Sequence, residues 1–139
     1  MLKLFTNMKE FNKDEYNKLC AEFLRMYQTD DGRYWEVTNN SVTNWYVEEL
    51  RFDSDWECIM EVVEAIENLK TETSSFGFYI YPKSSFVVVI KNYTFEIGDG
   101  GISVEPLKFN DSEYINSKSK KEAVVHTIWK FLNWYNENK

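Results

Sequence analysis

The sequence contains one histidine and only two cysteines among 139 residues. Cys20 and Cys58 lack the CxxC spacing of metal sites and fall on separate predicted helices, so they complete no typical zinc site with His126. Their spacing also gives no disulfide framework, and we expect reduced, buried thiols. A catalytic triad would have to recruit His126, and no G-x-S-x-G sequence is present. We therefore expect no catalytic residues, no metal ligands and no cofactor.

Long apolar runs and an excess of basic residues are also missing. No stretch approaches 18 uncharged apolar residues, and residues 1–10 hold no signal-peptide core, so we expect a cytoplasmic protein without membrane contact. The 16 basic side chains are outnumbered by 23 acidic ones, which gives a formal charge of −7. This charge opposes the counterion release that drives most nucleic-acid binding, so direct binding of DNA or RNA is not expected.

The sequence does contain enough hydrophobic and aromatic residues to form a hydrophobic core. Hydrophobic residues make up 43% of the chain and aromatic residues 17%, which is typical of a globular protein and not of a disordered one. The apolar periodicity predicts three helices, at about 13–27, 55–70 and 120–136. It predicts strands at 76–81, 86–90, 94–97 and 102–105, with further candidate strands at 34–38 and 43–52. Short connections favour an antiparallel meander, so we predict a single layered α+β domain over residues 1–139. In it, a three- to four-stranded sheet packs with about three helices.

Each predicted helix opens with a capping-box pattern, in which an N-cap side chain is followed three positions later by glutamate. The pairs are Asn12 with Glu15, Ser54 with Glu57, and Ser119 with Glu122. The apolar residues of the second helix spread over roughly 220° and those of the last over roughly 240°. Such breadth predicts that the second helix is central, packed on the sheet and flanked by another helix. It also leaves self-association through these two helices as a possibility.

The most specific surface feature is an acidic stripe on the second helix. Glu57, Glu61 and Glu64 fall within about 60° of its wheel. The stripe either solvates an exposed helix edge or forms a docking ridge for a basic partner. Trp129, at the border of the apolar arc of the last helix, is a candidate aromatic anchor, although core burial is its alternative.

Further aromatic anchors and the histidine can be placed in the same way. Trp45 and Tyr46 lie in an irregular segment and are also candidate anchors, again with core burial as the alternative. His126 lies in the polar stripe of the last helix between Glu122 and Lys130, so we expect it to be a solvated surface residue.

Two motifs resemble ligand-binding loops but fail on inspection. Asp53, Asp55 and Glu57 alternate as calcium ligands do, but Cys58 stands where the turn needs glycine. Acidic residues at a helix start are better explained by the positive end of the helix dipole. The stretch 98–101 lacks the lysine and hydroxyl of a phosphate-binding loop and precedes a strand, which predicts a hairpin turn.

Two segments resemble known sequences. Residues 52–67, with their acidic start, Trp56 and a Val-Val-Glu sequence, resemble a segment of small hypothetical proteins of Bacteroidota and their phages. Residues 121–125 and 131–137 are similar to the closing helix of the same group, which ends in a Trp-Tyr-Asn-Glu-like tail. The resemblance implies a phage or mobile-element origin and no catalytic residues.

These observations favour a non-enzymatic protein-binding factor. The hypothesis is a phage-encoded accessory protein or anti-defence inhibitor that binds a host protein through Glu57, Glu61, Glu64 and Trp129. The alternative is a small-molecule or nucleotide-binding domain, or a minimal enzyme, with a pocket between the sheet and residues 107–117. Carboxylates such as Glu96 and Asp99 could serve there.

Overall fold

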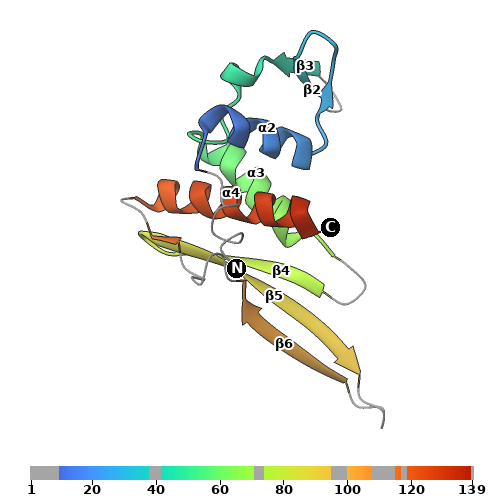
Figure 1. The fold of residues 1–139 in the computed structure, drawn as a ribbon, viewed down its shortest axis with the longest axis vertical. Helices are drawn as coiled ribbons and strands as arrows, with labels where there is room; N and C mark the ends of the chain where they lie inside the picture. The colour runs from blue at the N-terminus through green and yellow to red at the C-terminus, as the bar shows by residue number, and fades with distance from the viewer. Residues whose placement is uncertain are drawn as a thin grey trace.

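The computed structural model describes residues 10–37, 42–70, 74–94, 100–107, 115–116 and 119–138. The chain first forms α2 (Lys13–Phe23), β1 (Tyr27–Gln28), β2 (Tyr34–Val37), β3 (Val42–Trp45) and the short 3-10 helix η1 (Val47–Glu49). It continues with α3 (Trp56–Glu67), β4 (Ser74–Ile80), β5 (Ser84–Thr94), β6 (Gly100–Pro106), β7 (Ile115–Asn116) and α4 (Lys120–Asn138). This is an α+β fold with antiparallel sheets, as the sequence predicts (Figure 1).

The larger sheet is the predicted meander, with the order β4-β5-β6, and β7 pairs with the first residues of β5. One predicted connection is wrong, because β5 runs without a break through Asn92 and Tyr93. Among the described residues, β6 is the only strand that pairs with β5 beyond the pair Ser74–Lys91, so β5 and β6 form a two-stranded extension there. Figure 1 shows this hairpin extending past the helices.

The predicted turn at 98–101 is also displaced. Gly100 and Gly101 belong to β6 and pair with Thr94 and Tyr93 of β5, so the connection spans 95–99. Those five residues lie outside the described part of the chain, as does most of the predicted strand 94–97. The predicted strand 102–105 falls within β6.

The helices begin where side chains cap them. Asn12 Oδ1 accepts a hydrogen bond from the Glu15 amide (3.0 Å), and Ser119 Oγ accepts one from the Glu122 amide (3.1 Å). For α3 the predicted cap is wrong, because Asp55 and not Ser54 accepts from the Glu57 amide (2.9 Å). A carboxylate at this position also interacts with the helix dipole, which a serine hydroxyl does less well.

Helix α2 is shorter than predicted, since it ends at Phe23 and not at Tyr27. Arg25 has a φ of 60° and lies in the left-handed region. Its amide donates to Glu22 O (3.0 Å), and the amide of Met26 donates to Ala21 O (3.0 Å). This is the Schellman termination, with arginine where glycine is usual. The chain then turns into β1, which contains Tyr27.

The core lies between the larger sheet and α2. Figure 1 shows α4 across one face of the sheet, α3 beside it, and α2 with the smaller sheet on the far side of these helices. The buried residues that contribute to this core from α3 and α4 are Ile59, Val62, Val63, Ile66, Val124, Val125, Ile128, Trp129, Phe131 and Leu132. Because α3 packs on β4, on α4 and near α2, the prediction of a central, flanked helix is confirmed. The breadth of both apolar arcs therefore has an explanation within one chain.

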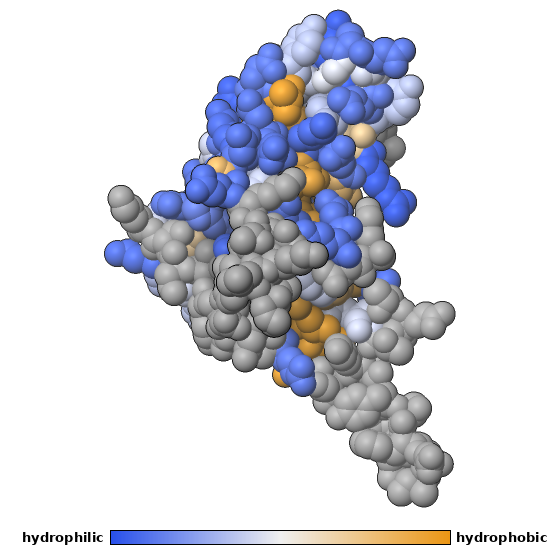
Figure 2. Space-filling view, in the orientation of Figure 1, coloured by the Kyte–Doolittle hydropathy of each residue, from blue (hydrophilic) through white to orange (hydrophobic). Residues whose placement is uncertain are grey.

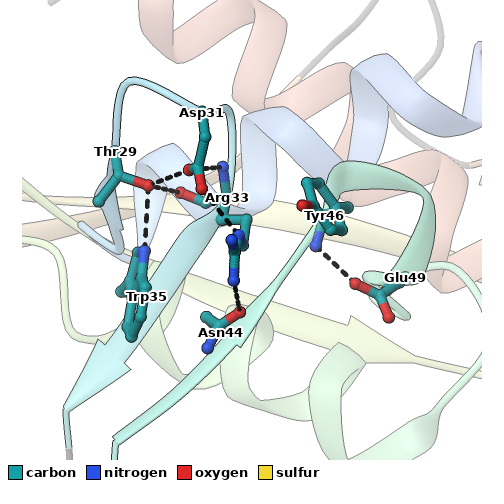
Figure 3. A network of polar contacts seen from close by, with 7 residues as sticks. All are labelled: Thr29, Asp31, Arg33, Trp35, Asn44, Tyr46 and Glu49. Carbon is teal, nitrogen blue, oxygen red and sulfur yellow. Dashed lines mark hydrogen bonds and ion pairs between the residues drawn. The ribbon is translucent and has the colours of Figure 1, made fainter.

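The smaller sheet has the order β1-β2-β3, and a polar network holds it together (Figure 3). Arg33 forms an ion pair with Asp31 (2.9 Å) and donates to Asn44 Oδ1 (3.3 Å). Thr29 Oγ1 accepts from Trp35 Nε1 (3.1 Å). Figure 2 shows that the face over α2 and this sheet is mainly hydrophilic, with small apolar patches.

The predicted strand 43–52 is correct only for its first residues. After Trp45 the chain enters η1, where Glu49 Oε1 accepts from the Tyr46 amide (2.8 Å). The buried side chain of Asn17 then accepts from the Phe52 amide (2.8 Å) and donates to Asp53 Oδ1 (3.1 Å). These bonds to the side chain of Asn17 on α2, 35 and 36 residues away in the sequence, give this segment polar partners other than those of a strand ladder.

Candidate functional site

The acidic stripe of α3 faces solvent. The side chains of Glu57, Glu61 and Glu64 are all exposed, as expected from the wheel of this helix. Within the described residues, no lysine or arginine lies within ion-pair distance of their carboxylates, and the one ion pair found joins Arg33 to Asp31. The stripe is therefore a row of carboxylates without a described counter-ion.

A pocket of about 240 Å³ opens beside this stripe, between α3 and the smaller sheet. We call it the α3 pocket. Its apolar lining comes from Met26, Trp45, Leu50 and Phe52. Its acidic lining comes from Glu36, Glu49, Asp55 and Glu61, and Arg51 and Cys58 complete it. Glu61 belongs to both features, so the acidic stripe and the α3 pocket form one continuous site.

The four carboxylates of the pocket differ in what they already bind. Glu49 accepts from the Tyr46 amide and Asp55 from the Glu57 amide, so both have backbone partners. Glu36 and Glu61 have no hydrogen bond or ion pair with any described residue. Arg51 is exposed and likewise forms no described ion pair. The lining thus contains four acidic side chains and one arginine, and its charge is mainly negative.

Burial, and after it the neighbouring negative charge, raises the pKa values of two groups in this site. The pKa of Glu61 is raised, first by partial burial and then by repulsion from Glu36 and Glu64. The pKa of Cys58 is raised first by burial and then by carboxylates around it, Asp55 before Glu61. The thiol therefore stays protonated at neutral pH, which does not suit a nucleophile. The site favours cations over anions.

The three candidate aromatic anchors, Trp129, Trp45 and Tyr46, differ in how far they are buried. Trp129 is not at the surface: it is 3% exposed, and the ring of Phe11 lies edge-on to it with centroids 5.5 Å apart. Its assignment to partner binding is thus wrong, because the chain before α2 covers the border of the apolar arc of α4. Trp45 is half-buried in the α3 pocket. Tyr46 is 43% exposed and lies beneath the Arg33 guanidinium, 5.2 Å from its ring centroid.

His126 is more covered than expected. It is half-buried, and its ring centroid lies 4.8 Å from that of Phe11. Burial lowers the pKa of His126; Glu122 raises it and Lys130 lowers it to a smaller extent. The imidazole is therefore mainly neutral at pH 7.

The two cysteines differ in their surroundings, and Cys58 alone of the two lines the α3 pocket. Cys20 is buried as predicted, whereas Cys58 is only half-buried, and both are free thiols. In the described ranges, no group of three or more histidine, cysteine or acidic side chains could hold a metal ion. Within the same ranges, no helix is long and apolar enough to cross a membrane. Glu96 and Asp99 lie outside the described residues.

Sequence reasoning found the stripe but missed the pocket. Glu36 and Trp45 belong to strands of the smaller sheet, and nothing in their spacing links them to Glu61 on α3.

Comparison of the chain with protein-family models, curated proteins and solved structures finds no match.

Proposed function

We propose that this protein is a non-enzymatic binding factor that recognises a basic surface on a partner protein through the acidic stripe and the α3 pocket. The observation that carries the proposal is the row of exposed carboxylates on α3, which have no ion-pair partner in the described part of the chain, continued by Glu36 of β2. Like charges held together destabilise the fold, and an oppositely charged partner would remove this repulsion. A charge pattern of this kind also accelerates association with a basic partner.

The partner class follows from the resemblance of the second and last helices. We propose that the gene is of phage or mobile-element origin and that the partner is a host protein, such as a component of a defence system. The small size and the raised pKa of Cys58 fit a binding role better than a nucleophilic one.

A pull-down from host lysate tests the proposal. The tagged protein should recover one stoichiometric partner, and a variant with Glu57→Lys, Glu61→Lys and Glu64→Lys should lose it. The matched control reverses three exposed acids elsewhere, Glu10, Glu22 and Glu137, and changes the net charge by the same amount. The control should retain the partner, and the loss at the stripe should be reproduced at low salt with purified components.

Two results would overturn the proposal. Equal capture by the stripe variant and the wild type would show that the stripe takes no part in binding. Equal loss in both triple variants would show that net charge alone governs retention, and not a site on α3.

The second candidate is a small-molecule or nucleotide-binding domain, or a minimal enzyme, and the α3 pocket is the observation in its favour. A ligand that binds the native state raises its melting temperature. A thermal-shift screen with nucleotides, sugars and divalent metals therefore separates the two candidates. A selective shift that depends on Glu36 or Cys58 would favour this one.

A further inference from the structure

Three properties of the α3 pocket indicate the kind of group that it can bind. Its walls include a half-buried indole, that of Trp45. Two of its carboxylates, Glu36 and Glu61, have no described partner and come from different elements, β2 and α3. Its volume of about 240 Å³ lies below the range of roughly 300–1,000 Å³ that is typical of pockets for drug-sized ligands and cofactors. The pocket is thus sized for a single side chain.

Two aromatic rings that are sequence neighbours of pocket residues already have a cation over them. The Arg33 guanidinium lies 5.2 Å from the ring centroid of Tyr46, and the Lys121 ammonium lies 5.7 Å from that of Trp56. Trp45 lies next to Tyr46 in the sequence, but no described cation lies over its ring. Indole is the ring that attracts cations most strongly.

We infer that the α3 pocket receives one arginine side chain of the basic partner, with the guanidinium between Trp45 and the carboxylates of Glu36 and Glu61. This inference rests on the proposed function and names the group that the partner must present. Arginine fits better than lysine because its planar guanidinium stacks on an aromatic face and donates to two carboxylates at once. Its methylene stem would lie against the apolar walls formed by Met26 and Leu50.

Arg51 acts as an internal competitor in this arrangement. It lines the pocket, is exposed and has no described ion-pair partner. Its positive charge reduces the attraction for an incoming guanidinium, as a like charge does at any interface. Removal of this charge should therefore strengthen binding, whereas removal of Glu36 or Glu61 should weaken it.

The experiment uses the full chain and a defined probe, N-acetyl-arginine methylamide, titrated at low salt and followed by backbone amide NMR. Chemical-shift changes should centre on Glu36, Trp45 and Glu61, with a dissociation constant on the order of 1 mM, as expected for a fragment-sized ligand. The citrulline analogue has nearly the same shape without the charge and should bind at least about tenfold more weakly, since charge-assisted hydrogen bonds are the stronger ones.

Single-residue variants of the pocket test where the arginine probe binds. Glu36→Gln and Glu61→Gln should each weaken binding by about fivefold or more, and Arg51→Gln should tighten it by roughly twofold to threefold. Glu22→Gln is the matched control, because Glu22 is an exposed helical acid that belongs neither to the stripe nor to the lining of the pocket. It should leave the dissociation constant within about twofold, because an exposed charge away from the pocket is largely screened. Amide spectra of each variant show directly whether it is folded.

Equal shifts with the arginine and citrulline probes would overturn the inference, as would shifts that are unaffected by Glu36→Gln and Glu61→Gln. The proposed function is tested separately. If the arginine probe fails but the triple reversal on α3 still abolishes partner capture, the stripe binds the partner without an arginine pocket. If the probe binds as expected but capture does not depend on the stripe, the pocket is real and the proposed protein partner is wrong.

Discussion

Removal of one charge from the candidate site should make the protein more stable. Glu61 interacts unfavourably with Glu36 across the pocket and with Glu64 one turn further along α3. Like-charge pairs on a helix surface destabilise it by about 0.2–0.5 kcal/mol each, and exposed charges are screened, so we expect Glu61→Gln to stabilise the fold by about 0.5–1 kcal/mol in low salt. For a chain of 139 residues this raises the melting temperature by about 1–4 °C.

Thermal and urea unfolding at several pH and salt conditions measure this gain. The folded pKa of Glu61 lies above its ordinary value near 4.5, so the carboxylate destabilises the fold at every pH above the folded pKa. As the pH falls below about 4.5, Glu61 is protonated in both states, and the advantage of Glu61→Gln should disappear. At about 1 M salt, where the Debye length is roughly 3 Å, the advantage should also shrink.

Two controls make the result decisive. Glu10→Gln removes an exposed acid outside the site and should change stability by less than about 0.5 kcal/mol. The double variant Glu36→Gln with Glu61→Gln should gain less than the sum of the single variants, because both remove the same repulsion. A gain at Glu61 no larger than that at Glu10, or strictly additive gains, would refute the proposed crowding of carboxylates.

Two further substitutions test the local structure. Arg25→Gly should stabilise the protein by about 0.5–1 kcal/mol in urea unfolding, because Arg25 has a φ of 60° and glycine adopts this conformation without strain. A loss of stability would instead show that the arginine side chain stabilises the end of α2. Asn17→Ala should destabilise the fold by about 2–4 kcal/mol, because it leaves the buried Phe52 amide without its acceptor and removes a second hydrogen bond. A loss below about 0.5 kcal/mol would mean that the loop after η1 finds another partner for this amide.

The parts of the fold that were predictable are those with local causes. The three helices follow from apolar periodicity, and the caps at Asn12 and Ser119 act over three residues. The meander follows from short connections between segments that contain β-branched and aromatic residues. The shift of the α3 cap from Ser54 to Asp55 is small, because two neighbouring residues can both cap and only their backbone conformations distinguish them.

The wrong predictions have long-range causes. The end of α2 depends on an arginine in a left-handed conformation, which sequence rules assign to glycine. The course of the chain near Phe52 depends on a hydrogen bond from Asn17. Trp129 is buried because Phe11, which precedes α2, lies against it. In each case the partner is distant in sequence, or the residue type is not the one that local rules expect.

The sequence by itself determined the class of this protein and its charged surface. Helix periodicity and capping are local, so α3 and the alignment of Glu57, Glu61 and Glu64 on one face could be derived from residue spacing alone. Only the tertiary structure decided that Glu36 and Trp45 join Glu61 around a pocket. The physical reason is that the contacts between the smaller sheet and α3 join residues far apart in the sequence and form only when the chain folds. The spacing of residues along the chain does not specify which surfaces then come into contact.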